Sequence, residues 1–221
     1  MRLVCSALAT LGFLAASGLI APAFAAATFP FDDFHLTSGP KATVPGSYGT
    51  VSLTQDGSDV DVLVQLASDE AFAHSNKGAS FYFDLDLGTI GLQDLTDGFT
   101  LKSTTAGTYH AGLVSTFNYE IFCDTCRGTG GIAGPLSFTL VNVSVADFIQ
   151  NNHGYYFSSS VCLGVTAGGL CADDAPSGNV TASFDPPSPM PEPATVALFG
   201  AGLLGLGGLA GFYRRRATSR G

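Results

Sequence analysis

The chain has 221 residues, 46% of them hydrophobic and 12% charged, and its formal net charge is −9 at pH 7. Because an acidic surface repels a phosphate backbone, we expect no nucleic-acid partner. Part of the hydrophobic share comes from an apolar segment at each end of the chain. Targeting segments have this composition and are set aside before the fold is considered.

The N-terminal segment has the parts of a secretory signal peptide. Arg2 supplies the positive start, residues 3–20 form an apolar stretch, and small residues follow up to Ala25. We expect residues 1–25 to be removed, with cleavage after Ala25 or after Ala27. An N-terminal anchor that is never removed is the alternative, and the run of small residues argues against it. The sequence therefore predicts export.

Residues 26–185 remain, and about 160 residues is the usual size of one globular domain. This region holds seventeen acids and four bases, a formal net charge of −13, and the bases are Lys41, Lys77, Lys102 and Arg127. Cations, neutral glycans and matrix polymers stay compatible with such a surface. The plainer interpretation is that the acids confer solubility.

Four cysteines belong to the mature domain, since Cys5 lies in the signal peptide: Cys123, Cys126, Cys162 and Cys171. An even number in an exported domain predicts disulfides, and proximity along the chain favours Cys123 with Cys126 and Cys162 with Cys171. A four-thiolate zinc site is an alternative, although the second pair has too wide a spacing. A redox role for the Cys-x-x-Cys pair would require a helix start, whereas a Gly-rich loop follows it.

The first clear structural signal in the domain is a β-hairpin. Residues 49–54 and 60–66 each alternate between apolar and polar side chains, and Asp56 and Gly57 supply a turn between them. Residues 80–87 alternate in the same way, which predicts another strand with one buried face.

Further strand candidates are residues 99–102, 113–122, 136–143, 155–161 and 180–184. One short helix is expected over residues 145–150, with Ser144 as its N-cap. No repeat of fixed period occurs, which disfavours a solenoid or propeller. The fold prediction is therefore all-β, an antiparallel β-sandwich of about eight strands with one short helix.

The C-terminal segment begins with a Pro-rich linker over residues 186–193. Residues 194–213 are uncharged, and twenty helical residues span the roughly 30 Å core of a bilayer. Residues 214–221 form a basic tail in which Arg214, Arg215 and Arg216 are expected to stay in the cytoplasm, so that the domain lies outside. Hydropathy alone leaves open a permanent single-pass anchor.

The order of three features in this segment is more specific. Pro191, Glu192 and Pro193 directly precede the apolar run, the run is rich in Gly, and an Arg cluster follows it. This arrangement resembles the PEP-CTERM sorting signal of Gram-negative bacteria. The resemblance implies processing near the Pro-Glu-Pro motif by an exosortase, a membrane cysteine protease, and an association with exopolysaccharide and biofilm. Residues 144–161 and 177–184 also resemble the sandwich-like domain that often precedes such a tail, a domain without an assigned activity.

Catalytic motifs are weak throughout the sequence. The histidines have no metal-binding spacing, and they are His35, His74, His110 and His153. No serine lies in a G-x-S-x-G elbow. Asp84 and Asp86 share a strand face and have the separation of a glycosidase pair, but acids on a solvated face are the plainer interpretation. We expect no catalytic residue, metal or cofactor.

Two binding alternatives remain open from the residues. The acids Asp56, Asp59 and Asp61 could offer oxygens to Ca²⁺, although their spacing is not that of an EF-hand. Four tyrosines could stack on sugars, although Trp is absent and packing at the edge of the core is the plainer role: Tyr109, Tyr119, Tyr155 and Tyr156.

The sequence thus predicts a structural protein that is exported, held briefly in the inner membrane, and then processed to the cell surface or extracellular matrix. A carbohydrate-binding or adhesive module is the second interpretation, and a secreted glycoside-acting enzyme is the third. The expected partners are an exosortase, the inner membrane and exopolysaccharide.

Overall fold

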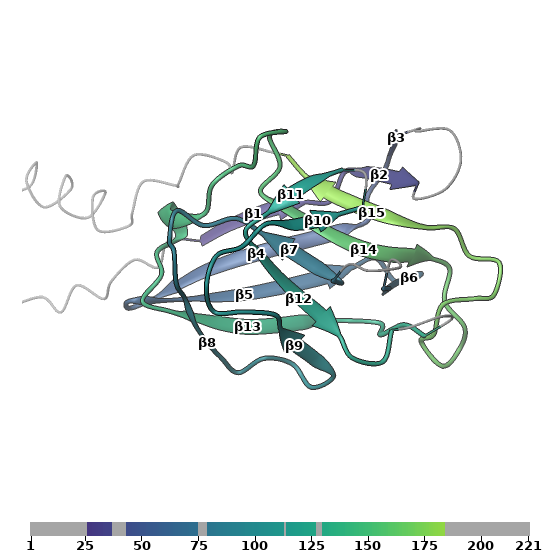
Figure 1. Cartoon of the computed structure of the whole chain (residues 1–221). Coiled ribbons are helices and arrows are strands. Elements are labelled where there is room, and N and C mark those ends of the chain that lie inside the picture. Colours follow the sequence, from purple (N-terminus) through teal and green to yellow (C-terminus); the bar gives the residue numbers. More distant parts are fainter. Residues whose placement is uncertain (1–25, 37–42, 75–78, 113, 127–129, 184–221) are drawn as a thin grey trace, which may run out of the picture. The chain divides into compact units, whose positions relative to one another are not determined.

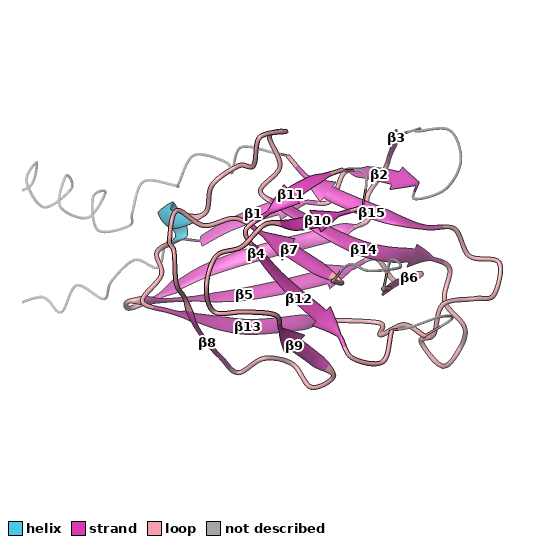
Figure 2. Cartoon of the chain, in the orientation of Figure 1, coloured by secondary structure: helices cyan, strands magenta, loops and turns pink. Residues whose placement is uncertain are grey.

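The computed structural model describes residues 26–36, 43–74, 79–112, 114–126 and 130–183. Within these ranges the chain consists of antiparallel strands and one short 3₁₀ turn, so the predicted all-β class is confirmed (Figures 1 and 2). No helix among the described residues is long and apolar enough to cross a membrane. The predicted signal peptide, linker, membrane helix and basic tail lie outside the described residues.

The smaller sheet has five strands in the order β1 (Ala26–Pro30), β4 (Gly49–Asp56), β5 (Asp59–Leu66), β13 (Leu136–Val141) and β8 (Gly91–Gln93). The predicted hairpin is confirmed: β4 and β5 pair along their full length, Asp56 opposite Asp59, and Gly57 has a φ of +60°. Burial alternates along β5 and β13, as expected for a sheet with one face in water.

The larger sheet follows the order β3 (Thr43–Pro45), β2 (Asp33–Leu36), β15 (Ser177–Ala182), β14 (Phe157–Leu163), β7 (Phe81–Phe83), β12 (Tyr119–Cys123) and β9 (Phe99–Leu101). A short strand, β6 (Glu70–Phe72), pairs with the end of β14. A separate hairpin consists of β10 (Tyr109–Ala111) and β11 (Ser115–Phe117).

Phenylalanine rings fill the space between the two sheets. Phe138 of the smaller sheet lies 5.8 Å from Phe83 and 6.1 Å from Phe81 of the larger one, measured between ring centroids. Phe29 and Phe157 meet at 5.0 Å, edge to face, the geometry that aromatic pairs prefer. The two sheets therefore pack face to face around one aromatic core, as in a β-sandwich.

Two strand predictions need correction. The strand expected over residues 80–87 ends at Phe83, and it is buried on both faces because the ring of Tyr82 packs at 5.8 Å against Phe117 of the separate hairpin. The strand expected over residues 113–122 is broken at Asn118. The Asn118 side chain donates to the backbone oxygen of Leu85 at 2.7 Å and accepts from the backbone nitrogen of the same residue at 3.1 Å.

The predicted helix is also shorter than expected. Ser144 is the N-cap, and its hydroxyl accepts from Ala146 while Asp147 accepts from the Ser144 backbone, which completes a capping box. Only Val145–Asp147 form a 3₁₀ turn. Phe148 is extended and buried against Phe157 at 5.5 Å, and this packing ends the helix.

Candidate functional site

The cysteines form the two disulfides expected from the sequence. Cys123 pairs with Cys126, with Cα atoms 5.4 Å apart, and Cys162 pairs with Cys171 at 5.8 Å. The first pair belongs to the main core, whereas the second lies in a separate cluster beside Ala71. A single zinc site that shares all four sulfurs is therefore excluded. Both sulfurs of the Cys-x-x-Cys pair belong to buried residues, unlike the exposed thiols of redox catalysts.

Asp84 and Asp86 do not form a carboxylate pair. Asp86 is exposed, as expected of an acid on a solvated face, but Asp84 is only 6% exposed and accepts from the backbone nitrogen of Asn118. Burial raises the pKa of Asp84 to about 6, although the bond from Asn118 acts in the opposite direction. The expected solvated position is thus wrong for Asp84, which acts as a buried acceptor for the chain break at Asn118.

The predicted calcium ligands serve as hydrogen-bond acceptors within the smaller sheet. Asp59 accepts from the backbone nitrogen of Asn142 at 2.8 Å, and Asp61 accepts from the hydroxyl of Thr139 at 2.7 Å. Asp56 lies opposite Asp59 at the hairpin turn. Among the described residues no group of three His, Cys, Asp or Glu side chains is placed to hold a metal ion.

One serine and one histidine meet, a contact that the sequence motifs did not reveal. The Ser115 hydroxyl lies 2.8 Å from Nδ1 of His153 and 3.0 Å from Oδ1 of Asn152. All three contacts are satisfied when the hydroxyl donates to Asn152 and His153 donates to the serine oxygen. In that arrangement the imidazole does not act as a base toward Ser115, so the contact fastens residues 151–154 to β11.

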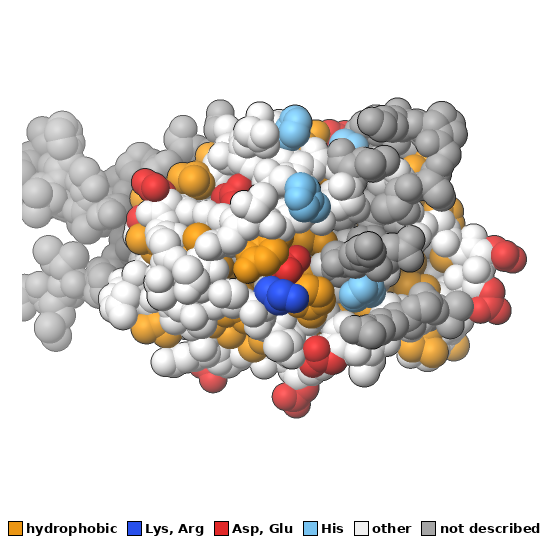
Figure 3. Space-filling model, in the orientation of Figure 1, with side chains coloured by type: hydrophobic (Ala, Val, Ile, Leu, Met, Phe, Trp, Pro, Cys, Tyr) orange, Lys and Arg blue, Asp and Glu red, His pale blue; other side chains and the backbone are white. Residues whose placement is uncertain are grey.

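Histidine and aromatic side chains gather on the face of the larger sheet that carries the hairpin (Figure 3). The His35 ring lies 5.9 Å from that of Tyr155, and His74 lies 6.2 Å from Phe122. The ammonium of Lys102 sits 4.8 Å above the same Phe122 ring. This face combines flat rings with basic groups on a domain that is acidic by sequence.

The four tyrosines proposed as sugar platforms are divided between different surroundings. Tyr119 is fully buried, and its hydroxyl donates to the backbone oxygen of Leu87 at 2.7 Å, so it cannot stack on a sugar. Tyr156 packs 5.0 Å from Phe29 at the edge of the main core. Tyr109 and Tyr155 both pack on the cluster beneath the hairpin and stay partly exposed.

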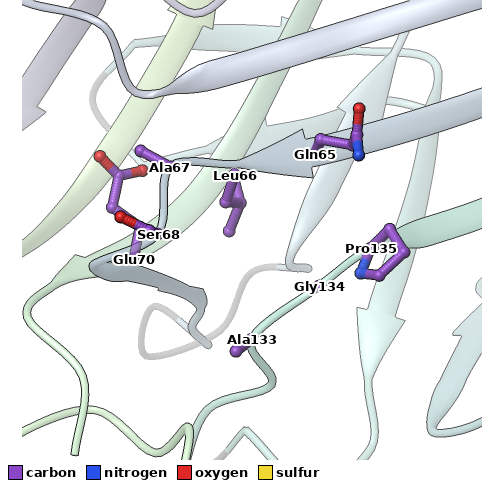
Figure 4. A pocket seen from close by; sticks show the side chains of 8 residues that line it. All are labelled: Gln65, Leu66, Ala67, Ser68, Glu70, Ala133, Gly134 and Pro135. Carbon is purple, nitrogen blue, oxygen red and sulfur yellow. The ribbon is translucent and has the colours of Figure 1, made fainter.

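A pocket opens where β5 ends and β6 begins, with a volume of about 190 Å³ (Figure 4). Its lining comes from the end of β5, the link to β6 and the segment before β13: Gln65, Leu66, Ala67, Ser68, Glu70, Ala133, Gly134 and Pro135. Alternation along β6 places Glu70 on the same side as Phe72, which is the core side. The pocket therefore has a carboxyl at the margin of the space between the sheets.

Glu70 is an unusual acid in this position. It is 4% exposed, and its Oε2 atom accepts no hydrogen bond from the described residues. Burial, with a smaller contribution from the negative charge of Asp69, raises the pKa of Glu70 to about 8. The carboxyl is therefore mostly protonated at neutral pH, and it can both donate and accept a hydrogen bond.

The sequence carried one signal for Glu70 that composition and motif searches overlook. Glu70 directly precedes the apolar run Ala71–Ala73, and a strand period of two places it on the side of Phe72. Charged residues are almost never fully buried unless they are paired, so this position departs from the usual distribution. A buried acid with a shifted pKa in a pocket marks a candidate site.

The sorting residues stay predictions, because Pro191, Glu192, Pro193 and the arginines Arg214, Arg215 and Arg216 lie outside the described residues. No family model, curated protein or solved structure matches the chain. The described residues thus offer two disulfides, one histidine-rich and aromatic face, and one pocket with a buried carboxyl.

Proposed function

We propose that this chain is an exported, exosortase-processed structural protein of the cell surface or extracellular matrix, without catalytic activity. The observation that carries the proposal is the pair of disulfides within a β domain that lies between two predicted targeting segments. Disulfides persist in oxidising compartments outside the cytoplasm. They agree with the export that the N-terminal segment predicts.

The chemistry of the domain favours a structural role. Asp84 is buried as a hydrogen-bond acceptor, and Asp86 is exposed, so a glycoside-acting enzyme built on this pair has no support in the geometry. The Ser115 hydroxyl lies within hydrogen-bond distance of Asn152 as well as His153. Both groups stabilise loops, which is the role expected in a rigid scaffold.

The proposed route has three steps. The signal peptide directs the chain through the general export pathway and is removed near Ala25. Residues 194–213 then hold the chain in the inner membrane, with Arg214–Arg216 in the cytoplasm. Finally an exosortase cleaves near Pro191–Pro193 and transfers the domain to the surface or matrix, where exopolysaccharide is the expected partner.

Replacing Pro191, Glu192 and Pro193 together by Ala tests this route. The variant is expected to keep its full C-terminus and accumulate in the inner-membrane fraction, while the wild type appears in the surface or matrix fraction as a shortened chain. Immunoblotting of fractionated cells with an antibody against the domain gives the distribution. The matched control replaces Pro186 and Pro187, which lie in the same linker, and it should behave as the wild type. A motif variant that distributes like the wild type would contradict the proposal.

A carbohydrate-binding module is the second candidate. The observation that favours it is the pocket at Glu70, which combines a buried carboxyl with the amide of Gln65 and the hydroxyl of Ser68. Sugar sites in general combine apolar surface with a few well-placed polar groups. The two candidates are compatible, since a matrix protein can hold its partner through such a module.

A further inference from the structure

We infer that the pocket lined by Glu70, Gln65 and Ser68 binds a single neutral sugar unit through hydrogen bonds to its hydroxyl groups. This inference goes beyond the export proposal, because it concerns a site on the described domain and requires neither the signal peptide nor the sorting tail. Its failure would leave the localisation experiment unaffected.

The composition of the pocket selects the ligand class. None of its lining residues is Lys, Arg or His, so it offers no counter-charge to a phosphate, a sulfate or an acidic sugar. The exposed Gln65 amide both donates and accepts, and the exposed Ser68 hydroxyl does the same. Leu66 and Pro135 supply apolar surface for the C–H groups of a ring (Figure 4).

The volume limits the size of the ligand. Pockets for drug-sized molecules usually enclose roughly 300–1,000 Å³. This pocket has about 190 Å³. One ring fits such a space better than an oligosaccharide, so a chain would be held by an end or a single unit.

Glu70 gives the site its specificity for a neutral ligand. Its carboxyl is buried, and Oε2 has no partner among the described residues, so a ligand hydroxyl would satisfy a group that the fold leaves unpaired. The protonated acid at neutral pH offers a donor as well as acceptors. An ionised carboxylate loses that donor and favours a cation instead.

Two titratable groups act on Glu70. The negative charge of Asp69 raises its pKa. Tyr48 precedes β4, and the pKa of its phenol is raised by burial and by the charges of Glu70 and Asp33, so it stays neutral below pH 9. Between pH 6 and pH 9 the change in this region is therefore the ionisation of Glu70.

Calorimetric titration of the full-length, disulfide-intact protein tests the inference. Glucose, galactose and mannose serve as neutral probes, and glucosamine replaces one hydroxyl by an ammonium group. At least one neutral hexose should bind at pH 6, and its affinity should fall at least about tenfold at pH 9.5 as Glu70 ionises. Glu70→Gln should bind with little dependence on pH, because its amide keeps a donor and an acceptor. Glu70→Ala should lose binding.

The matched control is Asp84→Asn, which changes the other buried acid with a strongly raised pKa but not the pocket. It should bind as the wild type does. Folding of each variant is checked by near-ultraviolet circular dichroism, since the core is aromatic. Absence of hexose binding to the folded wild type would overturn the inference. Binding of glucosamine alone, rising with pH through about 8 and lost in Glu70→Gln, would also overturn it and assign an ammonium site.

Discussion

The two sheets of the domain differ in how many of their faces are covered. Along β5 and β13, buried residues alternate with exposed or half-buried ones, so one face of the smaller sheet is open to water. In the larger sheet, β7 is buried at every residue, and β14 at all but its last. The hairpin of β10 and β11 covers the second face of these strands. The comparison teaches that alternation in a sequence reports solvent on one face, and loses its meaning where another element covers that face.

The largest expected effect separates the core face of the larger sheet from the open face of the smaller one. Phe83→Ala removes a ring that packs on Phe138 and stacks on Tyr119, and it should lower the free energy of unfolding by about 3–5 kcal/mol. Leu63→Ala, at a half-buried position of β5, should cost about 1 kcal/mol or less. Urea unfolding of the disulfide-intact protein measures both. Equal losses would contradict the assignment of the open face.

This contrast also explains which parts of the fold the sequence could predict. The hairpin of β4 and β5, the two disulfides and the Ser144 cap depend on neighbours within a few residues, and local patterns indicated them. Short strands such as β6 and β8 have three residues each, too few to show a period. The covered outer face depends on a hairpin distant in the sequence from β14, and no local pattern reports such a contact.

The candidate site shows the same division. Asp84 and Asp86 have the same local pattern, yet the structure buries one and exposes the other, because Asn118 from a distant segment binds Asp84. Glu70 was overlooked because its importance arises from burial beneath other segments. Its position on the core side followed from the strand period, but the existence of a strand over three residues did not.

The next effect concerns the buried acid at the margin between the sheets. Because the pKa of Glu70 is higher in the folded state, about 8, than its ordinary value of 4.5, folding is favoured at low pH and loses stability as pH rises through this interval. Glu70→Gln should therefore match the wild type near pH 4 and exceed its free energy of unfolding by roughly 3 kcal/mol at pH 9. Urea unfolding at both pH values measures the difference. Parallel pH profiles for the two proteins would contradict the burial of an uncompensated carboxyl.

The disulfides give a smaller contrast between the two ends of the larger sheet. Cys162 and Cys171 are nine residues apart and Cys123 and Cys126 are three apart, so the first bond closes the longer loop. Loop-closure entropy predicts a loss of about 2.7 kcal/mol when the first pair is replaced by Ala and about 1.9 kcal/mol for the second. Thermal unfolding of the two double variants ranks them. The reverse order would show that core packing around Cys123 outweighs chain entropy.

The smallest effect distinguishes adjacent serines on the two faces of β14. The Ser159 hydroxyl donates to the backbone oxygen of Ser80 at 2.8 Å, and Ser159→Ala should cost about 1 kcal/mol. The Ser158 hydroxyl is buried without a partner among the described residues, so Ser158→Ala should be neutral or stabilise the domain by up to about 1 kcal/mol. The same denaturation assay measures both variants. A loss for Ser158→Ala as large as that for Ser159→Ala would show that the outer face is not closed.

The intact mass of the protein recovered from culture tests the account most directly, because it reports both ends of the chain and the cysteines together. The account predicts a chain that begins at Ala26 or Thr28 and ends near Pro191–Pro193. Its mass should be lower than that of the reduced sample by four hydrogens, one pair for each disulfide. A chain from the inner membrane that still ends at Gly221, or one whose mass does not change on reduction, would contradict the account.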